Sequence, residues 1–338
     1  MSGIKTRGIN RQFIVKELPK DKLSPDHFTM QKVEVPEPGL NEILIRTLYL
    51  SLDAAARAWL QGRTYRDPVR PGMVMPGFTL AEVVASNDPD FAPGELVESN
   101  SGWQDYAVLK AEDLYKLPWR EPVTHYMSVL GVTGKTAYFG MLEIGQPKPG
   151  ETVVVSAAAG AVGSVAGQIA KIRGARVVGL AGSDEKCTFL TNELGFDAAV
   201  NYKTSVIRKA IAAQCRGGID VYFDNVGGDI LEACLFLMRE RGRIVCCGAL
   251  SYYDGVPPKA GPRGIPGLVV TKRLRIEGFI VLDFYNRRRQ AEEELATWVA
   301  DGRLKVYEDI IEGLENAPQG LVGLLAGQNR GKRIIKVV

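Results

Sequence analysis

The sequence contains few of the residues from which metal sites and disulfide frameworks are built. Its 338 residues include two isolated histidines, His27 and His125, and five cysteines, all in the second half of the chain. Zinc sites need closely spaced thiolates and imidazoles, often with a C-x-x-C pair, and no such pair occurs. We therefore expect no metal, and free thiols in a reducing compartment. The cysteines are Cys187, Cys215, Cys234, Cys246 and Cys247.

Strong net charge and long apolar runs are also absent. The formal net charge is only +3, which does not favour a nucleic-acid or membrane-surface partner. The N-terminus lacks the apolar stretch of a signal peptide and no run is long enough to span a bilayer, so we expect a cytoplasmic protein. In the basic cluster at 287–289, Arg288 and Arg289 are each followed four residues later by a glutamate, a spacing that indicates a solvated helix face.

The apolar residues, 46% of the chain, are enough for two domains. Up to about Leu117 the chain has short β-like runs separated by proline and glycine, a pattern that predicts a compact β-rich barrel or sandwich. We expect strands at 42–50, 80–84, 95–97 and 103–109.

After Pro122 the pattern changes to a helix over 123–142 and then to alternating strands and helices. This alternation predicts an α/β fold, a doubly wound parallel sheet that binds ligands at the carboxyl ends of its strands. The expected strands are 151–156, 176–181, 198–201, 220–225, 243–248 and 274–280, and the expected helices are 161–173, 184–194, 204–215 and 228–239. The rest is expected as helix 284–301, strand 306–311, helix 316–326 and strand 333–338, which gives domains at 1–122 with about 303–338, and at 123–302.

A small-residue turn links the first strand of this sheet to its first helix. Thr152–Val155 is an unbroken β-branched run, and Gly160, Ala161, Val162 and Gly163 lead into an apolar helix face. A strand, a glycine turn and a helix place unpaired N–H groups and the positive helix end where a pyrophosphate can bind. Ala158 replaces the first glycine of the usual G-x-G-x-x-G pattern.

Taken together, these motifs resemble the zinc-independent branch of the medium-chain dehydrogenase/reductases, and within it the NADP-dependent alkenal, prostaglandin and curcumin reductases. The resemblance implies a GroES-like first domain, a Rossmann second domain, often a homodimer, and NADPH-dependent reduction of the C=C bond of α,β-unsaturated ketones or aldehydes. The motifs that carry it are 48–53 (LYLSLD), 131–138 (GVTGKTAY), 157–168, 182–186 (GSDEK), 201–203 (NYK), 223–228 (FDNVGG), 247–249 (CGA) and 328–332 (QNRGK).

The end of the second strand favours NADPH over NADH. An NAD-specific Rossmann domain has an acidic residue there, whereas strand 176–181 runs into Gly182 and Ser183. These small residues leave room for a 2′-phosphate that Lys186 can reach. Asp184 and Glu185 follow, but in the first turn of a helix they favour the helix dipole.

The resemblance also implies roles for residues at the other strand ends. Tyr202 would lie near the adenosine phosphate, Asn225 near the nicotinamide ribose, and Asn329 would close over the cofactor. One short segment would follow the pyrophosphate and the nicotinamide: Cys247, Gly248, Ala249 and Ser251. A second would wall the carboxamide: Phe279, Ile280 and Val281.

Reduction of an enone sends hydride to the β-carbon and leaves an enolate, which needs a hydrogen-bond donor and then a proton. Neutral phenols are suitable donors. The family carries a tyrosine at the position of Tyr253, and some members carry a second one near the pocket that Tyr65 matches. Tyr252 is adjacent, and either of the two neighbours can face the substrate. The Pro- and Gly-rich stretch 254–268 is expected to be a lid or pocket wall, with a passive connector as the alternative.

The family commonly reads Asp-Pro-Tyr-Met-Arg where this chain has Asp53-Ala-Ala-Ala-Arg57, so the identity of the substrate does not transfer. Two other functions share the cofactor residues: an NADPH quinone reductase and a non-catalytic NADPH-binding protein.

Overall fold

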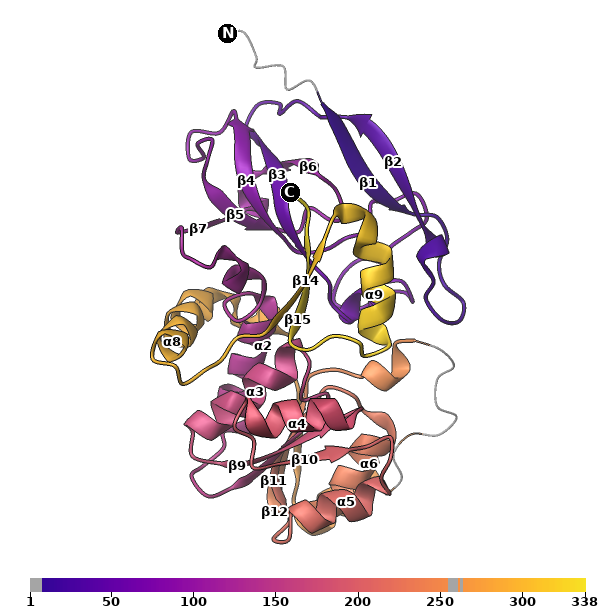
Figure 1. Cartoon of the computed structure of the whole chain (residues 1–338), viewed down its shortest axis with the longest axis vertical. Coiled ribbons are helices and arrows are strands. Elements are labelled where there is room, and N and C mark those ends of the chain that lie inside the picture. Colours follow the sequence, from indigo (N-terminus) through magenta and orange to yellow (C-terminus); the bar gives the residue numbers. More distant parts are fainter. Residues whose placement is uncertain (1–7, 255–260, 262–263) are drawn as a thin grey trace. The chain divides into compact units, whose positions relative to one another are not determined.

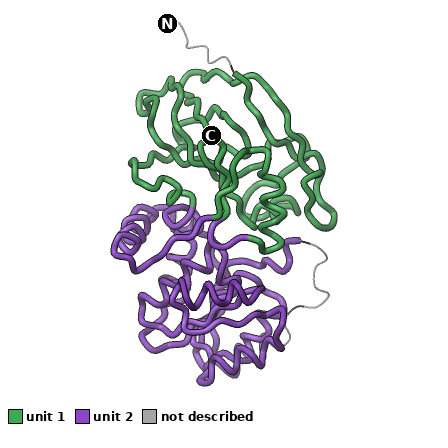
Figure 2. The backbone as a smooth tube through the Cα atoms, in the orientation of Figure 1, with its two compact units in different colours: residues 1–127, 309–328, 333–338 green, residues 128–308, 329–332 purple. Residues whose placement is uncertain are grey.

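The computed structural model describes residues 8–254, 261 and 264–338, and the chain divides into two compact units (Figures 1 and 2). Unit 1 comprises residues 1–127, 309–328 and 333–338, and unit 2 comprises residues 128–308 and 329–332. Four residues of the C-terminal segment, 329–332, therefore group with unit 2 although their neighbours on both sides group with unit 1.

Unit 1 is built mainly from two sheets. β1 (Ile9–Val15) and β2 (Phe28–Glu34) form an antiparallel pair. The second sheet has the order β14-β15-β3-β4-β5-β7, with β6 paired to β3. Its strands are β3 (Glu42–Ser51), β4 (Thr79–Ser86), β5 (Leu96–Ser99), β6 (Tyr106–Lys110), β7 (Tyr115–Leu117), β14 (Glu308–Glu312) and β15 (Lys332–Lys336), and its helices are α1 (Ala55–Trp59) and α9 (Ala317–Leu325).

Trp103 lies at the centre of the larger apolar core of unit 1. Its side chain is 1% exposed, its ring stacks on Phe28 with centroids 5.1 Å apart, and Phe13 packs against it edge-on. Gly77 makes this packing possible, because a Cβ there would lie 2.9 Å from Leu50 and 3.1 Å from the indole. A second core lies between the strands around Ile45 and Val83.

Unit 2 is a six-stranded sheet with helices, and its order is β10-β9-β8-β11-β12-β13. The strands are β8 (Thr152–Val155), β9 (Arg176–Ala181), β10 (Ala198–Asn201), β11 (Ile219–Asp224), β12 (Met238–Cys246) and β13 (Arg275–Gly278). The helices are α2 (Val132–Phe139), α3 (Ala161–Ile172), α4 (Asp184–Asn192), α5 (Ile207–Gln214), α6 (Gly228–Leu237), α7 (Ile265–Lys272) and α8 (Arg288–Ala300).

Every pairing in this sheet is parallel, and the strand order is that of a Rossmann fold. The central strands β8, β9 and β11 are largely buried, and Val154, Val178 and Tyr222 on them belong to one apolar cluster with residues of α5 and α6. α2 packs on α3, while α6 packs against both α5 and α7. The doubly wound sheet expected from the sequence is confirmed.

The single helix expected over 123–142 is wrong. Val123–Met127 is a 3-10 turn, α2 starts only at Val132, and the chain continues as a π-helical turn over Gly140–Gly145. Gly131 takes extended angles as the N-cap of α2, and a Cβ on Gly134 would lie 1.7 Å from the carbonyl oxygen of Val129. These two glycines let the chain fold back sharply where periodicity alone suggested a continuous helix.

The expected loop at 254–268 is also partly wrong. Residues 255–260 and 262–263 lie outside the described residues, but α7 begins at Ile265 and makes the last part of this stretch helical. Gly264 precedes α7 with a φ of +68°, and Pro266 occupies the first turn, where a missing N–H costs nothing. Glycine and proline residues that are typical of a loop therefore mark the start of a helix here.

Candidate functional site

The glycine turn after β8 has the geometry of an anion-binding turn. Ala157 has a φ of +46°, Gly160 is the extended N-cap of α3, and the first N–H groups of α3 have no acceptor within the helix. A Cβ on Gly163 would lie only 2.4 Å from the carbonyl oxygen of Ala157, so only glycine fits where the helix approaches the turn. Ala161 and Val162, in the first turn of α3, are half-buried.

The C-terminal segment of unit 2 lies directly on this turn. The N–H of Gly331 donates to the carbonyl oxygen of Ala159 at 2.8 Å, and Gly331 pairs with Gly160 in a parallel bridge. Asn329 is 8% exposed and donates through Nδ2 to the carbonyl oxygen of Gly331 at 2.8 Å. The structure therefore brings Asn329 to the turn although the two are far apart in sequence.

At the end of β9, both acidic residues that follow the small residues already have partners. Ser183 caps α4 by accepting the N–H of Lys186 at 3.2 Å. The Asp184 carboxylate accepts Nδ2 of Asn201 at 2.8 Å, and Glu185 forms an ion pair with Arg330 at 3.4 Å.

Two side chains flank Gly182 at the same strand end. A Cβ on Gly182 would lie 3.0 Å from the Tyr202 hydroxyl oxygen and 3.2 Å from Cε of Lys203. Burial raises the pKa of Tyr202 above its ordinary value, so its hydroxyl is protonated at neutral pH. From the sequence, Lys203 stood out only as part of the motif at 201–203. The signal for it is the register of β10, which pairs Asn201 with Ala181 and so carries the next residues past the end of β9.

The ends of β11 and β12 meet beside β8. Asn225 donates from its backbone N–H to Ser156 Oγ at 2.9 Å and from its side chain to the Ser156 carbonyl oxygen at 2.7 Å. The N–H groups of Cys247 and Gly248 both donate to the carbonyl oxygen of Asp224, at 2.9 and 3.1 Å. Ser251 Oγ donates to the carbonyl oxygen of Val226 at 2.6 Å.

Tyr253 and Tyr252 lie differently in this cluster. The Tyr253 hydroxyl accepts the N–H of Ala249 at 3.3 Å and lies near Gly248, whereas the Tyr252 ring lies against Gly227. Burial raises the pKa of Tyr253, so it remains a neutral phenol at neutral pH.

Phe279 packs into the interior of unit 2. A Cβ on Gly140 would lie 2.6 Å from Cζ of Phe279, so the glycine of the π-helical turn makes the slot that this ring fills. Ile280, with an extended backbone, and Val281, at the start of a 3-10 turn, follow it and are half-buried.

Tyr65 belongs to unit 1 and is 49% exposed. Its hydroxyl accepts Nε1 of Trp59 at 3.1 Å, and the guanidinium of Arg66 lies over the Trp59 ring. In the segment that departs from the family pattern, Asp53 accepts the hydroxyl of Ser51 at 2.5 Å and Arg57 is 1% exposed.

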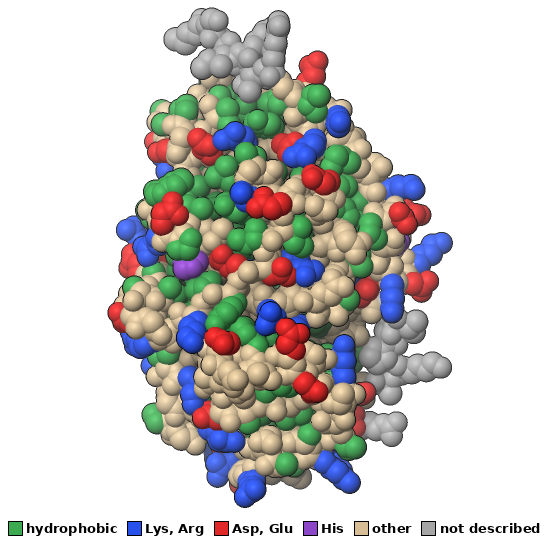
Figure 3. Space-filling view, viewed as in Figure 1, with side chains coloured by type: hydrophobic (Ala, Val, Ile, Leu, Met, Phe, Trp, Pro, Cys, Tyr) green, Lys and Arg blue, Asp and Glu red, His purple; other side chains and the backbone are tan. Residues whose placement is uncertain are grey.

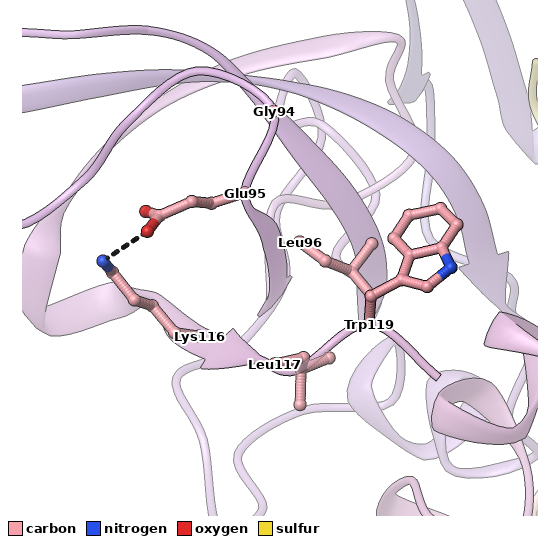
Figure 4. A pocket seen from close by; sticks show the side chains of 6 residues that line it. All are labelled: Gly94, Glu95, Leu96, Lys116, Leu117 and Trp119. Atoms are coloured by element: carbon pink, nitrogen blue, oxygen red, sulfur yellow. Dashed lines mark hydrogen bonds and ion pairs between the residues drawn. The ribbon is translucent and has the colours of Figure 1, made fainter. Parts of the chain in front are cut away.

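A separate hollow lies on the surface of unit 1 (Figure 4). Leu96, Leu117 and Trp119 line it, and an ion pair between Glu95 and Lys116 at 2.8 Å closes one side. None of the expected site residues lines this hollow. On the face drawn in Figure 3, positive and negative side chains are interspersed, in keeping with the small net charge.

The part of the chain that the structure describes lacks two features. It holds no group of three His, Cys, Asp or Glu side chains that could bind a metal ion. No helix among the described residues is long and apolar enough to cross a membrane.

Comparisons with known proteins agree along the whole chain. A family profile described as the N-terminal domain of oxidoreductase matches residues 11–117, and one described as zinc-binding dehydrogenase matches residues 161–300. The NADPH-dependent curcumin reductase of Escherichia coli is 42% identical over 97% of both chains. The NADP+-dependent 2-alkenal reductase of Nicotiana tabacum is 39% identical, also over 97% of both.

A solved structure gives the same result. CurA from Vibrio vulnificus in complex with NADPH is 38% identical and superposes with a TM-score of 0.93, covering 97% of this chain and 99% of that one. The chain belongs to the medium-chain dehydrogenase/reductase family, in the group of the NADP-dependent curcumin, alkenal and prostaglandin reductases.

Proposed function

We propose that this protein uses NADPH to reduce the C=C bond of α,β-unsaturated ketones or aldehydes. The end of β9 carries the cofactor part of the proposal: Gly182 and Ser183 follow the strand in place of an acidic residue, Tyr202 and Lys203 flank Gly182, and the carboxylates of Asp184 and Glu185 already have partners. These features suit a 2′-phosphate, and the relatives named above are NADPH-dependent reductases.

Different segments at the sheet edge would bind different parts of the dinucleotide. The first turn of α3, with Gly160 and Gly163, would hold the pyrophosphate, and Lys186 with Tyr202 would bind the adenosine end. The turns after β11 and β12, which contain Asn225 and residues 247–251, would hold the nicotinamide half, with residues 279–281 and Asn329 beside it. When bound, the cofactor supplies the hydride that reaches the β-carbon of the substrate.

Tyr253 would supply the hydrogen bond that the enolate oxygen needs. Its hydroxyl lies at the turn after β12 and is protonated at neutral pH, so it can donate to a developing negative charge or relay a proton. The position of the Tyr252 ring against Gly227 favours Tyr253 for this role. Tyr65 remains a second candidate for a substrate contact, on the resemblance alone.

Substitution of Tyr253 by phenylalanine tests this role. Because general acid groups typically contribute ~10²–10⁴-fold, kcat for a simple enone should fall by about that factor at saturating NADPH. Tyr252→Phe is the matched control and should keep turnover near the wild-type value. Full activity of Tyr253→Phe would mean that water or another group holds the oxygen and delivers the proton.

The reaction itself is tested by a substrate panel. NADPH consumption with enones, enals and quinones, followed by the mass of each product, shows which bond is reduced. We expect saturated ketones and aldehydes as products. Hydroquinones as the main products would instead identify a quinone reductase, and NADPH binding without turnover would identify a non-catalytic protein.

We also propose a homodimer that joins β13 to β13 of a second copy. β13 is the last strand in the order of the unit 2 sheet, and Ile276 on it is 39% exposed. An antiparallel pair centred on Ile276 would place Arg275 of each copy opposite Glu277 of the other, a complementary arrangement.

We also propose that the protein is located in the cytoplasm. All five cysteines are free thiols, as expected in a reducing environment. Cell fractionation tests it, and recovery in an oxidising compartment would contradict it.

A further inference from the structure

Asp224 is a buried carboxylate at the centre of the sheet edge, and the proposed chemistry does not use it. It is the last residue of β11 and is 2% exposed. Burial raises the pKa of Asp224, against the opposing effect of the hydrogen bonds donated to it. A carboxylate in such a position is retained only where its neighbours satisfy it.

The Asp224 side chain shapes the turn that follows β11. Its Oδ1 accepts the backbone N–H of Val226 at 3.0 Å and that of Gly227 at 2.8 Å. Gly227 and Gly228 both have positive φ, at +72° and +55°, so this turn has a conformation that few sequences adopt unaided. Asn225, whose amide we assign to the nicotinamide half, is the first residue of the turn.

Two further hydroxyl groups converge on the same oxygen. The Tyr222 hydroxyl donates to Asp224 Oδ1 at 2.7 Å, and Ser156 Oγ lies 3.3 Å from it. Ser156 follows β8 and accepts the N–H of Asn225, so the carboxylate links the glycine turn of β8 to the turn of β11. Tyr222 and Ser156 are both fully buried.

The backbone of Asp224 makes the third link. Its carbonyl oxygen accepts the N–H groups of Cys247 and Gly248, the first residues after β12. Asp224, at the end of β11, therefore contacts the ends of both neighbouring strands, β8 and β12, and the segments that it fixes are those assigned to the cofactor.

We infer that Asp224, with Tyr222 and Ser156, is a positioning unit that sets the relative geometry of the three turns that hold NADPH. The unit acts through Asn225 and the turn after β12, and it does not touch the substrate. This inference rests on the proposed cofactor contacts of those two segments.

Asp224→Asn and Tyr222→Phe test the inference through NADPH affinity. Each variant weakens the hydrogen bonds to the Asp224 carboxylate that hold the cofactor turns in place. We expect NADPH binding to weaken by about tenfold as a result, measured as Kd by nicotinamide fluorescence and as KM. The KM for NADPH should rise far more than kcat falls, and the double variant should be little worse than Asp224→Asn, because the two changes remove one shared interaction. If Asp224→Asn does not fold, Tyr222→Phe and Ser156→Ala remain as single deletions within the same unit.

Asp220→Asn is the matched control. Asp220 lies at the opposite end of β11 and accepts the N–H of Thr152 at 2.8 Å, so it also ties β11 to β8, but far from the cofactor turns. The control should lose thermal stability and keep its NADPH affinity. Equal weakening in the control, or an Asp224→Asn affinity within about twofold of wild type, would overturn the inference.

Asn225→Ala distinguishes a failure of this inference from a failure of the proposed cofactor site on which it rests. If Asn225→Ala weakens NADPH binding and Asp224→Asn does not, the cofactor site stands and the positioning unit is wrong. If neither variant weakens binding, the assignment of these turns to the cofactor is itself wrong.

Discussion

Lys186 is the residue on which the choice between the two nicotinamide cofactors depends most directly. It lies one turn into α4, with Ser183 capping its backbone N–H, and its side chain is half-buried at the end of β9 where no acidic residue is available for a ribose. A positive charge there favours binding of the 2′-phosphate of NADPH and makes no such interaction with NADH, which lacks this group.

We predict that Lys186→Ala raises the KM for NADPH by about tenfold or more and leaves the KM for NADH little changed, because one charge-assisted hydrogen bond is lost. Steady-state kinetics with both cofactors measure this. Lys209→Ala, an exposed lysine on α5, is the control and should change neither value. Equal effects of Lys186→Ala on both cofactors would contradict the assignment.

Much of this site was predictable from single residues, because glycines at strand ends and the absence of an acid after β9 are visible in sequence. The part played by Ser156, Asp224 and Gly331 was not, because it arises from hydrogen bonds between segments remote in the chain. The cofactor and substrate roles given to individual residues stay predictions until variants are measured.

At the scale of an element, the turn between β8 and α3 depends on a close approach that only glycine permits. The Cβ of an alanine at 163 would meet the carbonyl oxygen of Ala157 at 2.4 Å and Cα of Ala158 at 2.8 Å, both on the backbone. The clash can be relieved only by moving α3 away from the turn.

We predict that Gly163→Ala lowers the free energy of unfolding by about 1–3 kcal/mol and weakens NADPH binding at least tenfold. Chemical denaturation and cofactor titration measure the two effects. Gly217→Ala is the control, since a Cβ there meets nothing within 4 Å. A Gly163→Ala protein with normal affinity would show that the turn does not hold the pyrophosphate.

Several elements with strong periodicity were predicted well, and two that depend on glycine or proline were not. β9 and β10 have the expected bounds, and α3 and α4 begin where expected, because apolar runs and caps mark them. α7 was missed because Gly264 and Pro266 look like a loop, and the break before α2 was missed because Gly131 and Gly134 interrupt an otherwise helical pattern.

At the scale of the molecule, the proposed dimer predicts that the equilibrium between monomer and dimer depends on the charges of the β13 side chains. Glu277→Arg would place two arginines opposite each other in the antiparallel pair, so the protein should shift towards monomer in light scattering or sedimentation. Glu240→Arg is the control, because Glu240 is exposed and pairs with Arg273 off this edge. A wild-type monomer, or a Glu277→Arg dimer as stable as the wild type, would contradict the proposed interface.

The C-terminal segment also constrains the order in which the protein can mature. Residues 329–332 complete the glycine turn of unit 2, and β15, which overlaps them, pairs through Ile334–Lys336 with β3 near the start of unit 1. These residues follow every other element of both units in the chain. During synthesis on the ribosome, neither the sheet of unit 1 nor the dinucleotide turn can be finished until this segment has emerged, so both units must remain incomplete, and open to chaperones and proteases, until residues 329–336 are available.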